Sequence, residues 1–150
     1  MEQESESKRW ILVVEDNPDD EMLATRVFKK LGRIEEFVVA RDGEEAVRIL
    51  QEREAPTLVL LDLKLPRLSG VEVLTSIRDS ERLGAIPVVI LTSSSERTDL
   101  AACYALGCNA FVKKEIDFDT CVEQLKTTFD FWLNVNLPPP VEMPRVTQAA

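Results

Sequence analysis

Histidine is absent from all 150 residues of the chain. Without it, the chain cannot carry a Ser-His-Asp triad, a histidine-ligated metal ion or a phosphohistidine of its own. Cysteine is scarce as well. The three cysteines show neither metal-ligand nor redox spacing, and their odd number favours reduced thiols. We expect these thiols to be small core residues rather than reactive groups.

Two further deficits concern basic charge and apolar length. The chain has 18 basic against 27 acidic residues, and its net charge of −9 repels the phosphate backbone of nucleic acids. No apolar run approaches the roughly 20 residues that span a membrane. The polar, acidic start MEQESESKRW does not resemble a secretory signal. We therefore expect a cytoplasmic protein that binds neither nucleic acid nor membranes.

The chain does contain a regular alternation of short apolar segments and longer segments of helical period. A chain of this length forms one domain. The segments WILVV, TLVLL and PVVIL are apolar at consecutive positions, which is typical of strands buried on both faces of a parallel sheet. The sequence thus predicts an α/β, doubly wound sheet of five parallel strands with five helices. The expected strands are 10–14, 37–40, 57–61, 87–91 and 110–113.

Capping residues mark the expected helix starts. Asn17 precedes Pro18 and a run of acidic residues, the order of an N-cap followed by a first helical turn. A fifth helix is expected from about Asp117, with apolar residues at spacings of three and four. Three other capping side chains stand three residues before a glutamate, as in a capping box, and these are Asp42, Ser69 and Ser93.

Polar residues close the expected strands. Ligands of doubly wound sheets bind beyond the carboxyl ends of the strands, so these residues should meet. Clustered carboxylates suit Mg²⁺, and a carboxylate can also form an aspartyl-phosphate. A lysine would then neutralise the phosphoryl charge, and a threonine hydroxyl would bond the attached group. The residues are Glu15 and Asp16 after the first strand, Asp62 after the third, Thr92 after the fourth, and Lys113 with Lys114 at the fifth.

Four segments resemble a known family. ILVVEDNPDD, LVLLDLKLPRLSG, PVVILTSSS and GCNAFVKKE are similar, in order and separation, to the landmark segments of two-component response-regulator receiver domains. The resemblance covers about residues 9–134. It implies a flavodoxin-like fold with strand order 2-1-3-4-5, phosphorylation by a sensor histidine kinase, and Mg²⁺ as the cofactor.

The resemblance also implies a role for each matching residue. Asp62 would be the phosphoacceptor, Thr92 the switch hydroxyl, and Phe111 the aromatic switch residue, where the family often has tyrosine. The implied ligands of Mg²⁺ are Glu15, Asp16, Asp62 and the backbone carbonyl of Lys64.

The lysine of the family is normally followed by a proline after a cis peptide bond. The family spacing, counted from Gly107, selects Lys114, with Lys113 as the alternative, and Glu115 stands in place of the proline. A non-proline cis bond costs about 2.5–4 kcal/mol. We therefore expect a trans bond here, and the loop after the fifth strand to take its own course.

The two ends of the chain complete the expected organisation. Residues 1–8 should be a flexible tail, 9–134 a receiver domain, and 135–150 a proline-rich extension, which together describe a stand-alone receiver. The stretch FDFWLNVNLPPP is similar to the extension of response regulators that accompany phytochrome histidine kinases. That similarity implies a phytochrome-type kinase as partner and a homodimer formed through the fifth helix and the extension.

The expected function is signalling through protein contacts rather than enzymatic turnover. One alternative is a dimeric interaction module that works without phosphorylation. Another is a phosphatase of the haloacid-dehalogenase type, which needs a second acid two residues after the nucleophile, where this chain has Lys64. Phosphate acceptance separates the first alternative from a receiver, and repeated turnover of phosphate esters would identify the second.

Overall fold

The computed structural model describes residues 9–140. All its strands are parallel and form one sheet in the order β2-β1-β3-β4-β5. The expected doubly wound sheet and its order are therefore confirmed. The strands are β1 (Trp10–Val14), β2 (Glu36–Ala40), β3 (Leu58–Leu61), β4 (Val88–Thr92) and β5 (Ala110–Lys113), each within one residue of its expected bounds.

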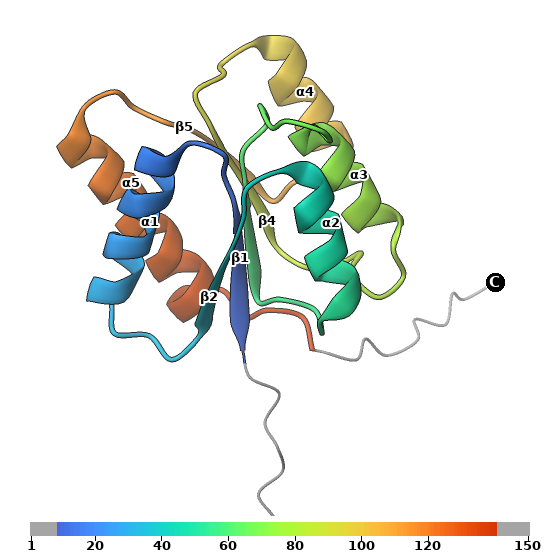
Figure 1. The fold of residues 1–150 in the computed structure, drawn as a ribbon, viewed down its shortest axis with the longest axis horizontal. Helices are drawn as coiled ribbons and strands as arrows, with labels where there is room; N and C mark the ends of the chain where they lie inside the picture. The colour runs from blue at the N-terminus through green and yellow to red at the C-terminus, as the bar shows by residue number, and fades with distance from the viewer. Residues whose placement is uncertain (1–8, 141–150) are drawn as a thin grey trace, which may run out of the picture.

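Helices cover both faces of the sheet (Figure 1). One face carries α1 (Pro18–Lys30) and α5 (Phe118–Asp130). The other carries α2 (Gly43–Glu52), α3 (Gly70–Asp79) and α4 (Arg97–Ala105). This arrangement explains why the central strands are apolar at consecutive positions, since both of their faces are buried.

The core consists of two apolar layers, one on each side of the sheet. Along β1, Ile11 and Val13 pack toward α1 and α5, whereas Leu12 and Val14 pack toward the other helices. Phe129 of α5 is fully buried and meets Phe28 of α1 edge to face, with ring centroids 5.4 Å apart. Burial of such a side chain contributes about 1.5–3 kcal/mol, so α1 and α5 are firmly held against the sheet.

The strand register brings the polar strand ends together. Val14 pairs with Leu61, so the residues that follow them, Glu15 and Asp62, leave β1 and β3 at the same level. On the other side of β3, β4 and β5 pair Thr92 with Lys113, and Lys114 follows directly. Parallel pairing thus collects residues from four segments at one edge of the sheet.

Most of the expected helix caps are confirmed. The side chain of Asn17 accepts bonds from the backbone of α1, and Ser69 forms a full capping box at the start of α3. Asp42 and Asp117 cap α2 and α5 through their side chains.

The capping role expected of Ser93 is wrong. Helix α4 begins after Glu96, with no side-chain cap. The loop instead turns inward at Ser94, whose Oγ donates a hydrogen bond to Asp99 Oδ2 at 2.6 Å in the first turn of α4. The motif SSSE contains no sign that Ser94, rather than Ser93, is the buried serine.

The end of α5 also differs from a simple helix. It continues as a short π-helix, η1 (Phe131–Val135). Arg33 from the α1–β2 connection donates from Nη2 to the carbonyl of Leu133 at 3.1 Å and also bonds the side chain of Asn134. The wider turn thus has a partner for one of its free carbonyl groups.

Parts of the expected domain organisation lie outside the described residues. These are the tail 1–8 and the last part of the extension, 141–150. The boundary at 134 falls within the π-helix, and the prolines at 138–140 are described without helix or strand. Within residues 9–140, no helix combines the length and the apolar character needed to cross a membrane.

Candidate functional site

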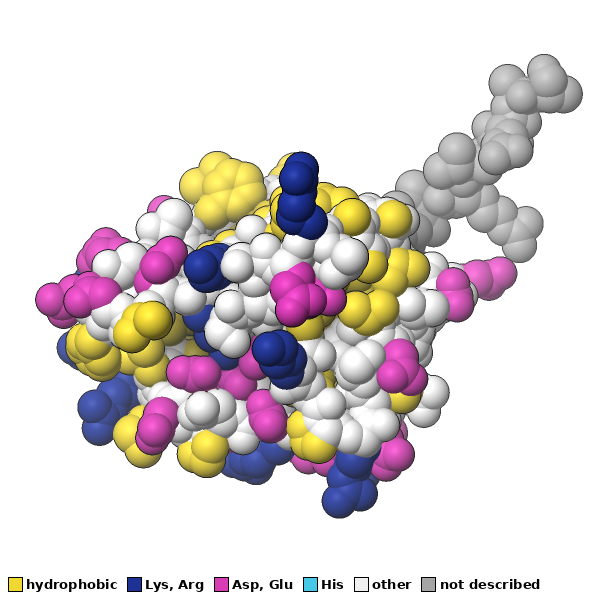
Figure 2. All heavy atoms as spheres, turned by 90° about the horizontal axis from the view of Figure 1, so that it is seen from above, with side chains coloured by type: hydrophobic (Ala, Val, Ile, Leu, Met, Phe, Trp, Pro, Cys, Tyr) yellow, Lys and Arg dark blue, Asp and Glu magenta, His cyan; other side chains and the backbone are white. Residues whose placement is uncertain are grey.

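Three carboxylates form a cluster at the carboxyl edge of the sheet, the edge seen from above in Figure 2. One oxygen each of Glu15, Asp16 and Asp62 lies within 4.8 Å of the others. Glu15 and Asp62 are buried, with 5% and 8% of their surface exposed, whereas Asp16 is exposed. Oxygen ligands that are this close and open to water on one side suit a hard divalent cation such as Mg²⁺. The three residues therefore fit the expected metal.

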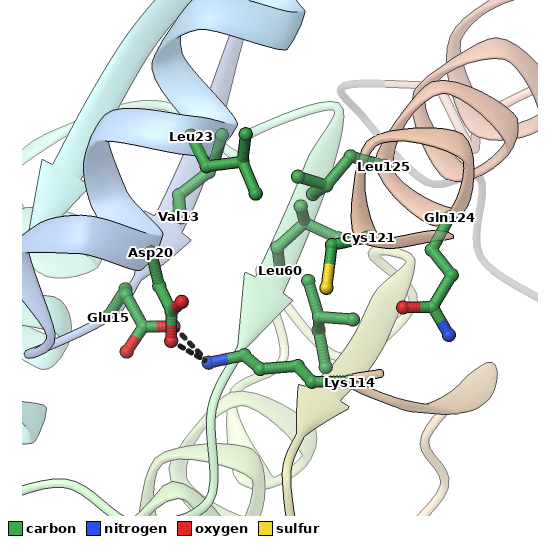
Figure 3. A pocket seen from close by; sticks show the side chains of 11 residues that line it. Val13, Glu15, Asp20, Leu23, Leu60, Lys114, Cys121, Gln124 and Leu125 are labelled. Atoms are coloured by element: carbon green, nitrogen blue, oxygen red, sulfur yellow. Dashed lines mark hydrogen bonds and ion pairs between the residues drawn. The ribbon is translucent and has the colours of Figure 1, made fainter. Parts of the chain in front are cut away.

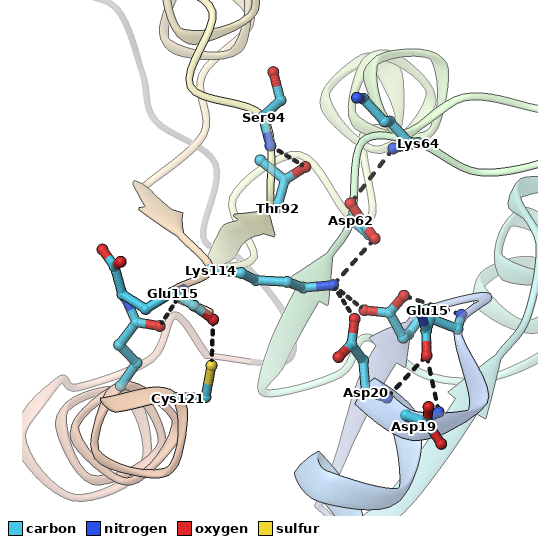
Figure 4. Close-up of polar contacts among 12 residues, drawn as sticks. Glu15, Asp19, Asp20, Asp62, Lys64, Thr92, Ser94, Lys114, Glu115 and Cys121 are labelled. Carbon is cyan, nitrogen blue, oxygen red and sulfur yellow. Dashed lines mark hydrogen bonds and ion pairs between the residues drawn. The ribbon is translucent and has the colours of Figure 1, made fainter. Parts of the chain in front are cut away.

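Lys114 is the cationic partner of this cluster (Figure 4). Its Nζ donates to Asp62 Oδ2 at 3.2 Å, to Asp20 Oδ2 at 2.9 Å, and to Glu15 Oε1. The neighbouring Lys113 is exposed, because successive side chains of a strand point to opposite faces. Of the two candidate lysines, the structure brings Lys114 to the carboxylates. No cis peptide bond occurs among residues 9–140.

Burial and charge act in opposite directions in this cluster. Burial raises the pKa of Glu15 to about 7, against the lowering effect of the Lys114 ammonium. Burial would lower the pKa of Lys114, but its bond to Glu15 and the charges of Glu15 and Asp62 raise it above the ordinary lysine value. The ammonium group therefore stays charged at neutral pH and compensates the buried acids.

Hydrogen bonds to β1 and to the loop after β3 hold Asp62 in place. Its backbone N–H donates to the Val14 carbonyl at 3.1 Å, and its Oδ1 accepts a 3.4 Å bond from the Lys64 N–H. Arg67 adopts a left-handed backbone with φ of 72°, which turns the loop toward α3. The Lys64 side chain is exposed, so its expected contribution to a metal site rests on its backbone alone.

Thr92 lies next to this cluster and is fully buried. Its Oγ1 accepts a 3.3 Å bond from the Ser94 N–H in the β4–α4 loop. Phe111 on β5 is half-buried and packs against the core on the side of α2, α3 and α4. Thr92 thus lies at the end of β4 beside the β4–α4 loop, and Phe111 lies within the neighbouring strand β5.

Two residues that the sequence did not mark as functional contact this region. Asp20 matched the preference of helix starts for acids, yet its carboxylate bonds Lys114. Gln124 on α5 carried no local signal, yet it bonds the backbone on both sides of Lys114. Figure 3 shows both lining a small cavity of about 40 Å³, between α1, α5 and the sheet.

Comparison with known proteins identifies the family. Residues 11–126 match the response regulator receiver domain. This chain belongs to the receiver-domain family. Among the relatives of this receiver is the probable methanogenesis regulatory protein FilR2 of Methanothrix harundinacea, 39% identical over 91% of each chain. Response regulator Rcp1 of Synechocystis is 36% identical over 92% of this chain and 99% of its own.

Solved structures agree with the fold of this receiver. The Mn²⁺-bound form of response regulator Rcp1 matches with a TM-score of 0.84 and 34% identity, covering 88% of this chain and 99% of that one. The phosphorylated cyanobacterial phytochrome response regulator RcpA matches with a TM-score of 0.85 and 32% identity, covering 89% and 99%. The receiver thus has the fold and the acidic edge of a family of two-component signalling proteins, with relatives among phytochrome response regulators.

Proposed function

We propose that this receiver accepts a phosphoryl group from a sensor histidine kinase on Asp62, in a Mg²⁺-dependent reaction, and signals through protein contacts. The observation that carries the proposal is the pairing of Asp62 with Lys114 at 3.2 Å inside a cluster of carboxylates. A buried carboxylate at the carboxyl edge of a doubly wound sheet, with a lysine and two acidic neighbours, supports a role as phosphoacceptor.

The transfer follows from the residues at the site. A carboxylate oxygen of Asp62 attacks phosphorus, the phosphorus–nitrogen bond of the kinase phosphohistidine breaks, and the released imidazole takes up a proton from water. The Lys114 ammonium stabilises the negative charge on the phosphoryl oxygens. Once the group is attached, Thr92 gives up its bond to the Ser94 N–H and turns its hydroxyl toward the phosphoryl oxygen.

A metal ion has a defined place in this scheme. Glu15, Asp16 and Asp62, with the Lys64 carbonyl, would hold Mg²⁺. When bound, the ion supplies further positive charge to the phosphoryl oxygens. The Mn²⁺-bound form of Rcp1 supports the binding of a divalent cation by a receiver of this fold. The phosphorylated form of RcpA supports phosphate acceptance by such receivers.

Intact mass after incubation with acetyl phosphate and Mg²⁺ tests the proposal. We expect the wild type to gain one phosphoryl group, and neither Asp62→Asn nor a metal-free sample to gain any. The conservative Asp79→Asn variant, at the far end of α3, is the matched control and should be phosphorylated like the wild type. Folding of Asp62→Asn is checked by its unfolding transition.

The intact-mass experiment, together with an assay of phosphate release, separates the alternatives. A folded wild type that binds Mg²⁺ but gains no mass would favour an interaction module that works without phosphorylation. Continuous release of phosphate from small phosphate esters would favour a phosphatase of the haloacid-dehalogenase type. Slow loss of a single phosphoryl group fits the proposed receiver, whose own site can hydrolyse the acyl phosphate.

The proposed donor is a phytochrome-type histidine kinase in the cytoplasm, and the proposed assembly is a homodimer through α5 and the extension. The likeness to RcpA, a phytochrome response regulator, supports the donor. A direct test compares phosphate transfer from an autophosphorylated phytochrome kinase with transfer from a kinase of another sensor class. Equal transfer rates from both kinases would contradict the assignment.

A further inference from the structure

The backbone around Lys114 lies at the free edge of the sheet. Strand β5 is the last strand of the order within residues 9–140, so in this part of the chain only one of its sides pairs with another strand. The Lys114 N–H points to that paired side and donates to the Thr92 carbonyl at 2.8 Å. In an extended chain the groups of the flanking residues point the other way, so Lys113 C=O and Glu115 N–H face the unpaired side.

Gln124 of α5 satisfies both of these unpaired groups. Its Nε2 donates to the Lys113 carbonyl at 2.7 Å, and its Oε1 accepts a 3.3 Å bond from the Glu115 N–H. The side-chain amide therefore offers one donor and one acceptor to the edge of β5, as the backbone of a neighbouring strand would. This pairing also fixes which way the amide of Gln124 is turned.

A second contact from α5 holds the same loop. Cys121 stands one helical turn before Gln124, on the same face of the helix. Its thiol donates to the Glu115 carbonyl, the next polar backbone group along the loop. Figure 3 shows Cys121 and Gln124 lying beside Lys114.

We infer that Gln124 is the positioning residue for Lys114. The bond from the Glu115 N–H to Gln124 requires a residue other than proline at position 115, because proline has no N–H to donate. The two amide bonds fix the backbone before and after Lys114, and they thereby aim its side chain at Asp62. The inference rests on the proposed function, in which Lys114 stabilises phosphoryl charge.

The variant Gln124→Met tests this role in the full chain. Methionine keeps the length and the helix preference of glutamine but makes neither bond. We expect the initial rate of Mg²⁺-dependent phosphorylation by acetyl phosphate to fall about threefold to tenfold, less than the roughly 10²-fold cost of a 1 Å displacement, because three carboxylates still hold the ammonium. Gln51→Met, an exposed glutamine on α2, is the matched control and should keep the wild-type rate.

Two further measurements distinguish positioning from general loosening. The Mg²⁺ affinity of Gln124→Met, measured by calorimetry, should stay at the wild-type value, because Glu15, Asp16 and Asp62 are held by β1 and β3. Amide hydrogen exchange at Glu115 should become roughly fivefold faster, as expected for the loss of one ordinary hydrogen bond.

The outcomes are distinct. A wild-type rate in Gln124→Met, unchanged exchange at Glu115, or a parallel fall in Mg²⁺ affinity and rate would each overturn the inference. If the wild type itself accepts no phosphoryl group, the proposed function fails. Exchange at Glu115 then still decides whether Gln124 holds the loop, since that measurement requires no phosphorylation.

Discussion

Gly70, the first residue of α3, lies directly against the backbone of Asp62. A Cβ at position 70 would come within 2.2 Å of the Asp62 carbonyl oxygen and 2.6 Å of the Leu63 Cα. The Gly70 N–H also donates to the Leu63 carbonyl at 3.0 Å. The close approach closes the loop that starts at Asp62, and it explains why the segment LDLKLPRLSG ends in glycine.

Gly70→Ala should therefore move the loop that carries Asp62. We expect a loss of about 1–3 kcal/mol in the free energy of unfolding, as for other overpacked sites, together with slower phosphorylation. Chemical denaturation and intact mass measure the two effects. Gly32→Ala is the control, because Gly32 has a φ of +63° but no atom within 4 Å of an added Cβ. Its cost should be limited to about 1–2 kcal/mol of left-handed backbone strain, with normal phosphorylation. Equal phosphorylation by both variants would contradict the prediction.

Replacement of Lys114 should make the stability of the fold depend more strongly on Mg²⁺. In Lys114→Met the carboxylates of Glu15, Asp20 and Asp62 lose their shared cation. We expect a loss of about 2–4 kcal/mol in metal-free buffer, because an acid left buried without its partner is costly. Thermal unfolding should then show a larger stabilisation by Mg²⁺ in the variant than in the wild type. Lys113→Met, which removes an exposed lysine, should change neither value. An equal Mg²⁺ effect in all three proteins would refute this expectation.

Arg33 should stabilise the fold in a pH-dependent way. It forms a two-pronged ion pair with the buried Glu35, at 3.0 and 2.7 Å. Burial would raise the pKa of Glu35, but the hydrogen bond and charge of Arg33, a backbone hydrogen bond and the charge of Arg9 together outweigh burial and lower the pKa. The resulting stabilisation is present above the ordinary glutamate pKa and is lost as the pH falls toward the lowered value.

We accordingly expect Arg33→Ala to lose about 2–4 kcal/mol at neutral pH and less in acid, as measured by denaturant unfolding at several pH values. The control is Arg41→Ala, since Arg41 forms a similar pair with Glu21 but is exposed. That variant should show little change at any pH. A deficit for Arg33→Ala that grows in acid would have the wrong sign for this explanation.

The proposed dimer should depend on apolar residues after α5. Phe131, Val135 and Leu137 expose 44%, 65% and 91% of their surface. Truncation after Asn134 should weaken the dimer, because it removes two of these side chains and the rest of the extension. Size-exclusion chromatography with light scattering over a range of concentrations measures the change. Val135→Ser with Leu137→Ser in the full chain should act in the same direction. An unchanged elution volume for the truncated protein would exclude the extension from the interface.

Local sequence determined the elements and the acidic part of the site. Apolar runs in WILVV and TLVLL showed strands buried on both faces, because this pattern depends only on neighbours along the chain. Since parallel strands end at one edge, it also followed that Glu15 and Asp62 would meet there, and the register confirms this meeting. The caps at Asn17 and Ser69 were predictable for the same reason, since each is a contact within one helical turn.

Tertiary structure decided the contacts that cross the sheet edge. The family spacing already favoured Lys114 over the adjacent, chemically identical Lys113, and the pairing of β5 with β4 places Lys114 at the acids. Asp20 and Gln124 join the same site through contacts with a residue or backbone on another element. Such contacts depend on the distance and direction between packed elements. A local sequence pattern contains neither. The acids of this site were therefore predictable from the sequence, whereas the contacts that hold Lys114 were visible only in the folded structure.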